Sequence, residues 1–138
     1  MAKAELSDIY RSYIACLNAQ DWSQLGQFVD SSVWHNGRQI GLSGYRAMLE
    51  QDFRDIPDLH FNIELLIADA PYVASRLAFN CAPQATFLGL DVSGKRVAFT
   101  ENVFYEFRQE GRQEGSKARI VRVWSVIDKA AIERQLQT

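Results

Sequence analysis

The side chains of this sequence that could do chemistry are dispersed along the chain. It contains no glycine-rich phosphate loop, no Gly-x-Ser-x-Gly turn and no His-Glu-x-x-His motif. The sequence therefore has no motif for phosphate binding, for a serine nucleophile or for a catalytic zinc site. Glu101 and Asn102 interrupt an apolar segment that reads as a β-strand. Because successive strand residues point to opposite faces, one of the two must face inward, and the sequence does not decide which. His35 follows Trp34. His35 can transfer a proton near neutral pH through its imidazole. An equal alternative is that His35 has a structural role, held by hydrogen bonds.

Asp128 follows another apolar segment, four residues after Trp124. Lys-Ala-Ala-Ile comes directly after it, and aspartate is favoured as the N-cap of a helix. Asp128 can therefore cap a helix or face a ligand, and the two roles are compatible. Trp124 lies two strand periods earlier and should share the face of Asp128, either as core or as the wall of a pocket.

Helical spacing of apolar residues predicts the elements on either side of the candidate His35. Residues 6–17, 22–29 and 45–53 show the i, i+3, i+4 pattern of amphipathic helices, and residues 128–136 form a shorter one. The third helix begins after Ser43 and must end before Pro57, because the residue before a proline disfavours the helical conformation. Val33, Trp34 and His35 lie between the second and third helices.

From His60 onward the apolar period changes to two, which predicts strands over residues 61–67, 72–81, 97–108 and 118–127. The repeat RQEGRQEG at residues 108–115 is predicted to be a solvent-exposed hairpin tip. Helices followed by consecutive antiparallel strands give an α+β order, which excludes a doubly wound nucleotide-binding fold.

Composition limits the class of protein and its partners. The 138 residues, 47% of them hydrophobic, predict one compact domain over residues 1–138. Fifteen Lys and Arg against 17 Asp and Glu give a net charge of −2, which argues against nucleic acid as a partner. No segment has the length of a membrane span or the pattern of a signal peptide, so we expect no membrane partner. We expect a cytoplasmic location, with Cys16 and Cys81 as buried thiols.

The closing segment RIVRVWSVIDKAAIERQL, with its W-x-x-x-D spacing, resembles the end of the SnoaL-like polyketide cyclase family. SVWHNG at residues 32–37, GLSGYRAMLEQDFRDIPDLHF at 41–61 and FLGLDVSGKRV at 87–97 resemble other family segments in the same order. The resemblance implies the cone shared with nuclear transport factor 2 and ketosteroid isomerase. In that cone, three N-terminal helices pack on a strongly curved antiparallel sheet that encloses one pocket.

Cyclases of this family close a polyketide ring by intramolecular aldol condensation, with no cofactor and no metal. The resemblance implies that Asp128 is the acid–base residue and that His35 assists it. A carboxylate in an apolar pocket suits this role, because desolvation raises its pKa toward the working pH. The expected ligand is a small, largely apolar carbonyl compound. The candidate ligand-binding residues are Leu17, Trp34, Met48, Glu101, Asn102 and Trp124.

The sequence also departs from the family pattern. Pro83 stands where many cyclases carry a histidine, and Arg122 replaces a common glutamate. Leu17 and Met48 occupy positions that are polar in aromatic-polyketide cyclases. These changes favour a more apolar ligand, and they leave open a non-catalytic binding or dimerisation module of the same fold. Because the predicted strands carry large apolar side chains on both faces, we expect a homodimer joined through the outer face of the sheet.

Overall fold

The computed structural model describes residues 2–109 and 117–137 as one α+β unit. The elements, in chain order, are α1 (Lys3–Ala19), the 3-10 helix η1 (Trp22–Gln27), β1 (Val29–His35), β2 (Arg38–Gln39), α2 (Gly41–Asp55), β3 (Asn62–Asp69), β4 (Tyr72–Cys81), β5 (Thr86–Phe87), β6 (Leu90–Asp91), β7 (Val97–Gln109), β8 (Ala118–Ile127) and α3 (Lys129–Leu136).

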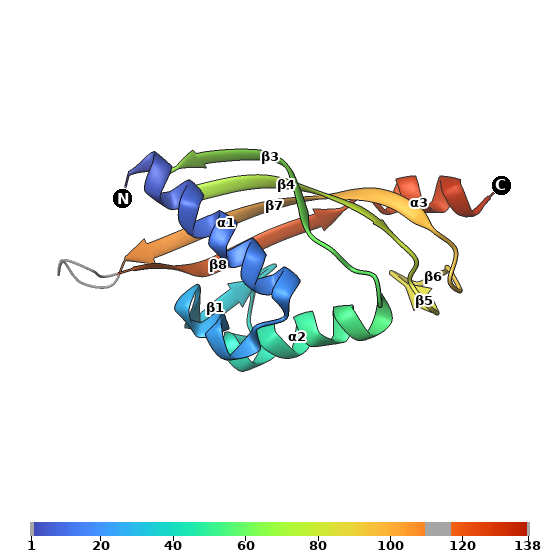
Figure 1. Cartoon of the computed structure of the whole chain (residues 1–138), viewed down its shortest axis with the longest axis horizontal. Helices are drawn as coiled ribbons and strands as arrows, with labels where there is room; N and C mark the ends of the chain where they lie inside the picture. The colour runs from blue at the N-terminus through green and yellow to red at the C-terminus, as the bar shows by residue number, and fades with distance from the viewer. Residues whose placement is uncertain (1, 110–116, 138) are drawn as a thin grey trace.

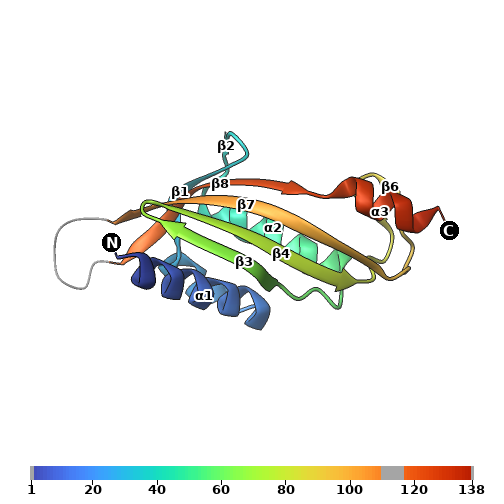
Figure 2. The same cartoon turned by 90° about the horizontal axis from the view of Figure 1, so that it is seen from above.

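A curved sheet forms one layer of the molecule, with the strand order β2-β1-β8-β7-β4-β3. Strands β3, β4, β7 and β8 pair antiparallel, as the alternating pattern predicts. Helices α1 and α2 lie on one side of this sheet, and α3 follows β8 at one end (Figures 1 and 2). The fold class predicted from the sequence is therefore confirmed. The space between α2 and the long strands β7 and β8 is where a site can form.

The second predicted helix is wrong in its extent. It is a 3-10 helix that ends at Gln27, and Val29 begins strand β1. The polar run Asp30-Ser31-Ser32 reads as a turn, but β1 pairs in parallel with β8, with an irregular register between Val29 and Trp34. Pairing with a strand almost a hundred residues away overrides the local signal. The sheet is therefore mixed, not purely antiparallel.

The core joins one face of α1 to the inner face of the sheet. Tyr10, Tyr13 and Leu17 of α1 are almost completely buried, and so are Leu77 and Tyr105 on the sheet. Each such side chain contributes about 1.5–3 kcal/mol by leaving water, so this contact fixes the angle at which the helix crosses the strands.

Two further expectations concern local features. Cys16 and Cys81 are buried free thiols, as predicted. The predicted hairpin tip at residues 108–115 lies mostly outside the described residues, and only Arg108 and Gln109 are seen, at the end of β7. In the described part of the chain, every helix is too short or too polar to span a bilayer.

Candidate active site

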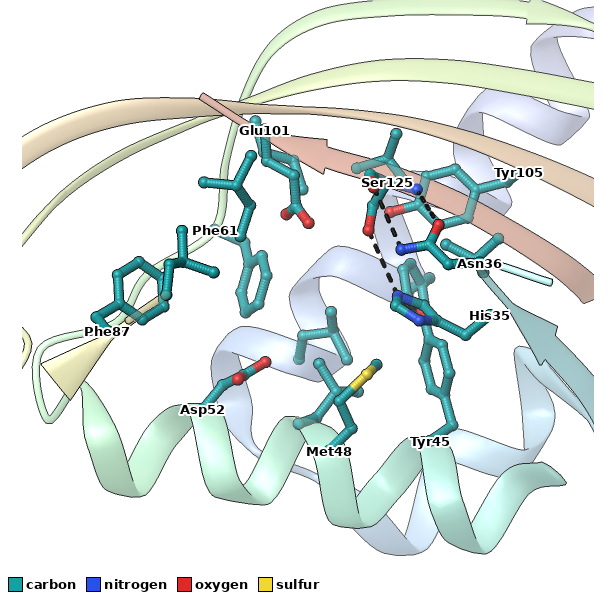
Figure 3. Close-up of a pocket in the computed structure, with 18 of the residues that line it drawn as sticks. His35, Asn36, Tyr45, Met48, Asp52, Phe61, Phe87, Glu101, Tyr105 and Ser125 are labelled. Carbon is teal, nitrogen blue, oxygen red and sulfur yellow. Dashed lines mark hydrogen bonds between the residues drawn. The ribbon is translucent and has the colours of Figure 1, made fainter. Parts of the chain in front are cut away.

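A cavity of about 440 Å³ lies between α2 and the inner face of the sheet, and it is large enough for a small organic ligand. Most of its wall is apolar or aromatic, and a few polar groups converge on it (Figure 3). The lining residues are Tyr13, Leu17, His35, Asn36, Tyr45, Met48, Leu49, Asp52, Phe61, Leu77, Phe87, Leu88, Glu101, Val103, Tyr105, Val123, Ser125, Ile127 and Lys129.

Glu101 is the inward-facing member of the Glu101–Asn102 pair. Its neighbours on the same face of β7, Val103 and Tyr105, also line the cavity. Asn102 points to the opposite face, where its side-chain oxygen accepts a hydrogen bond of 2.9 Å from Nε of Arg76 on β4. The structure thus answers the question that the sequence left open.

Burial raises the pKa of the Glu101 carboxyl from its usual 4.5 to about 7. The negative charge of Asp52 raises it further, and a hydrogen bond with the Ser125 side chain lowers it in part. The group therefore carries its proton for a large fraction of the time at neutral pH. A carboxyl with this pKa can both take and return a proton under physiological conditions.

Asp52 is a second carboxyl in the same cavity. It lies on α2 one helical turn after Met48, so the two side chains share the helix face that lines the cavity. Burial raises the pKa of Asp52 to about 6, and the charge of Asp55 adds to this effect. Figure 3 shows Asp52 and Glu101 pointing into the cavity from opposite sides, one from the helix and one from the sheet.

His35 and Ser125 meet at one end of the cavity, where β1 and β8 run side by side. The Ser125 hydroxyl lies 3.4 Å from Nε2 of His35. Burial lowers the pKa of His35, which favours the neutral imidazole at neutral pH. The Asn36 amide holds the Ser125 backbone by two hydrogen bonds: it accepts from the backbone N–H at 2.8 Å and donates to the carbonyl at 3.3 Å. The side chain of Ser125 is thereby held between His35 and Glu101.

Three tyrosines, Tyr13, Tyr45 and Tyr105, line the cavity, and Tyr10 lies behind them in the core. The hydroxyls of Tyr13 and Tyr45 are 2.6 Å apart, and Tyr10 donates to Tyr105 at 3.3 Å. Burial raises the pKa of all four phenols, so they stay protonated. A pair of hydroxyls has two protons and uses only one in its mutual bond, so the second can be donated to a ligand oxygen.

The other predicted site residues divide into two groups. His35, Leu17 and Met48 line the cavity. Trp34 and Trp124 do not, because they alternate with inward-facing residues on β1 and β8. Both are 39% exposed, and both border a smaller hollow of about 210 Å³ that shares only Val123 with the main cavity.

Asp128 stands at the N-cap of α3. Its Oδ1 accepts a hydrogen bond of 3.2 Å from the backbone N–H of Ala131, and its side chain is exposed. Its neighbours Ile127 and Lys129 line the cavity, whereas Asp128 is not among the lining residues. The sequence allowed Asp128 either to cap a helix or to face a ligand, and in the structure it caps α3.

Sequence reasoning missed Asp52, Asn36, Ser125 and the tyrosine pair. Asp52 had a usable signal, because it follows Met48 by four residues on a predicted helix that ends soon after. The others had none, because their roles depend on the parallel pairing of β1 with β8 and on the tertiary contact that brings Tyr13 of α1 to Tyr45 of α2. In the described part of the chain, no three His, Cys, Asp or Glu side chains come together as metal ligands would.

The family model of the SnoaL-like polyketide cyclases matches residues 7–136. The crystal structure of a SnoaL-like polyketide cyclase from Agrobacterium tumefaciens is 53% identical, with a TM-score of 0.89 over 99% of both chains. TsrD from Streptomyces laurentii shares the fold at 19% identity, with a TM-score of 0.78 over 99% of this chain and 97% of its own. IdmH from Streptomyces antibioticus does so at 17%, with a TM-score of 0.76 over 96% and 98%. A search of the curated proteins returns no match.

Proposed function

Since the chain belongs to the SnoaL-like polyketide cyclase family, we propose that it is a cofactor-independent enzyme for a small, largely apolar carbonyl compound. The reaction is an acid–base one, either an aldol cyclisation or an isomerisation. The observation that carries this proposal is the Glu101 carboxyl, which lies in an apolar wall with a pKa of about 7.

In the proposed reaction, the Glu101 carboxylate takes a proton from a carbon next to the substrate carbonyl. The electron pair of that C–H bond moves to the carbonyl oxygen and gives an enolate. The Tyr13–Tyr45 pair lines the same cavity, and its spare proton can be donated to the enolate oxygen. Donors fixed in a water-poor wall stabilise such an oxyanion more strongly than water does, because they need no reorganisation.

The neutral imidazole of His35 assists through Ser125. Because the Ser125 hydroxyl contacts both His35 and Glu101, it can orient the carboxyl toward the substrate carbon. This keeps the assisting role that the family resemblance implies for His35. It places the proton transfer on Glu101, where the resemblance pointed to Asp128.

A binding module without catalysis is the second candidate. One observation favours it: Asp128, which matches the acid–base residue of the family, caps α3 and is not a lining residue. In that case the cavity would hold an apolar carbonyl ligand without turning it over. The two candidates differ in whether the enzyme exchanges the substrate's acidic proton.

Proton exchange at a model ketone tests the proposal. 2-Tetralone in deuterated buffer loses its acidic proton signal in an NMR time course, and the wild-type protein should accelerate this loss. Glu101→Gln should lower the rate by about 10²–10⁴, because the amide cannot accept the proton. Glu106→Gln makes the same change on the outer face of the same strand and should leave the rate unchanged.

The outcomes separate the candidates. A wild-type protein that binds 2-tetralone without accelerating exchange would support the binding module. Loss of exchange in Asp128→Asn with full exchange in Glu101→Gln would return the acid–base role to Asp128. Both variants are to be compared at equal folded fraction, measured by thermal melting.

We also propose that the protein forms a homodimer through the outer face of its sheet. Phe104 pairs across the sheet with Trp124 on one side and with Ala74 on the other, and Ala74 pairs with Ile67. Ile67, Phe104 and Trp124 are 53%, 56% and 39% exposed, so an apolar stripe crosses four strands in contact with water. A second copy brings the same stripe, which a two-fold interface buries on both sides. The cytoplasmic location expected from the sequence stays a prediction.

A further inference from the structure

Two carboxyls enter the cavity from opposite walls, and the mechanism above uses only one of them. Glu101 comes from the sheet and Asp52 from α2 (Figure 3). Both also border a smaller hollow of about 60 Å³ that continues toward a group of phenylalanines, among them Phe79 and Phe99. The two acids therefore line both spaces, so a ligand that reaches from one into the other lies beside them.

Neither carboxyl is explained by a structural role. Within the described residues, Asp52 and Glu101 form no ion pair, and the Asp52 side chain has no hydrogen-bond partner. A largely buried, unpaired carboxyl costs stability, and an apolar or amide residue at the same place would avoid that cost. Groups kept at such a cost are candidates for function when they line a cavity.

We propose that Asp52 is a second catalytic residue of this site. It exchanges a proton with the oxygen of the carbonyl that the enolate carbon attacks, while Glu101 exchanges one with the substrate carbon. This inference rests on the proposed function and narrows it. An isomerisation needs one carboxyl, which takes a proton from one carbon and returns it to another. An aldol closure forms a new hydroxyl, and the oxygen needs a donor of its own. Two carboxyls facing each other across the ligand therefore fit the aldol reaction.

The proton balance of this step closes within the pair. The reacting form is the tautomer of the singly protonated pair in which Asp52 carries the proton and Glu101 does not. It is the less populated tautomer, because Glu101 binds the proton more tightly than Asp52 does. Glu101 takes the proton from the carbon, the enolate carbon bonds to the second carbonyl carbon, and the oxygen of that carbonyl takes the proton of Asp52. One C–H and one C=O π bond are broken, and one C–C and one O–H bond are formed. The pair ends with one proton, now on Glu101, and exchange with solvent returns it to the starting state.

The pair should work while it holds one proton. The pKa values of about 6 and 7 belong to the coupled pair, so this state is most populated between them. Aldol activity should therefore be bell-shaped in pH, with its maximum between about 6 and 7. The other titratable groups that line the cavity with the pair are His35 on β1, Lys129 at the start of α3, and the phenols Tyr13, Tyr45 and Tyr105. Asp55 lies on the exposed side of α2 and acts on Asp52 only through its charge.

Two model reactions separate the roles of the two acids. Exchange at 2-tetralone needs only the carbon base. Cleavage of 4-hydroxy-4-phenyl-2-butanone to acetone and benzaldehyde, the reverse of an aldol addition, needs a proton taken from oxygen and another given to carbon. Asp52→Asn should lower cleavage by about 10²–10⁴ and exchange by less than about tenfold. The pH midpoint of the remaining exchange should fall, because Glu101 loses a neighbouring negative charge.

Asp55→Asn is the matched control, because it removes the same charge from the exposed side of the same helix. It should leave both rates within about threefold of wild type. Asp52→Glu keeps the carboxyl and should recover part of the cleavage rate, which keeps the proposal testable if Asp52→Asn folds poorly. Unchanged cleavage in a folded Asp52→Asn protein, or an equal fall of cleavage and exchange, would overturn the proposal. Failure of the wild type or insensitivity to Glu101→Gln in the exchange assay would instead overturn the proposed function itself.

Discussion

Replacement of Glu101 by glutamine should change how the free energy of unfolding depends on pH. Folding raises the pKa of this carboxyl from 4.5 to about 7, so the native state binds the proton more tightly than the unfolded chain does. The corresponding stability is fully present below about pH 4.5 and is lost as the pH rises through about 7. Each pH unit between the two pKa values is worth about 1.4 kcal/mol, so wild type should lose about 3 kcal/mol over this window.

Glu101→Gln keeps the shape of the side chain and removes the titration. Urea denaturation at half-unit steps from pH 4 to pH 8.5 gives both stability curves, and the difference between them isolates Glu101. Asp52 contributes a loss of the same sign to both proteins, because its pKa is also raised by folding. The variant should gain about 3 kcal/mol relative to wild type between pH 4 and pH 8.5. Parallel curves would show that Glu101 ionises without cost in the native state, which would contradict a raised pKa for this carboxyl.

Three other changes test separate parts of the structure. Asp128→Ala should cost about 0.5–2 kcal/mol of stability by removing the cap of α3, whereas Asp128→Asn should cost only a few tenths, as measured by urea denaturation at pH 7.5. Tyr45→Phe removes one hydroxyl of the oxyanion pair and should lower exchange at 2-tetralone by about 10²-fold; an unchanged rate would remove the pair from the mechanism. Phe104→Lys places a charge in the centre of the outer stripe and should shift sedimentation from dimer to monomer, while a wild-type monomer at micromolar concentration would contradict the proposed assembly.

The predictable part of the fold is the part governed by local periodicity. Strands β4 and β8 have the predicted bounds, and β7 differs by one residue, because apolar residues recur along most of each segment and turn residues bound them. Strand β1 could not be predicted in the same way. Its polar run Asp30-Ser31-Ser32 has no strand signal of its own, and the pairing that makes it a strand comes from β8.

The candidate site shows the same division. The sequence identified Glu101 and Asn102 as a pair with one inward member, but the choice between them depends on which face of β7 meets α2. The sequence also offered two roles for Asp128. The capping role could be predicted from the helical residues that directly follow it. Asp52 escaped notice because a carboxylate on an amphipathic helix ordinarily faces water, and only the tertiary arrangement turns it toward Glu101.

Direct titration of the Glu101 carboxyl carbon by NMR shows whether this cavity holds a carboxyl that can exchange protons at neutral pH. Selective ¹³C labelling of glutamate side chains, with Glu101→Gln to assign the resonance, would follow this one group from pH 3 to pH 9. We expect a midpoint of about 7 for Glu101 in the wild type, and a lower midpoint in Asp52→Asn. A Glu101 resonance that completes its titration near pH 4.5 would contradict this expectation, because such a carboxylate would lie in water and not in the apolar cavity.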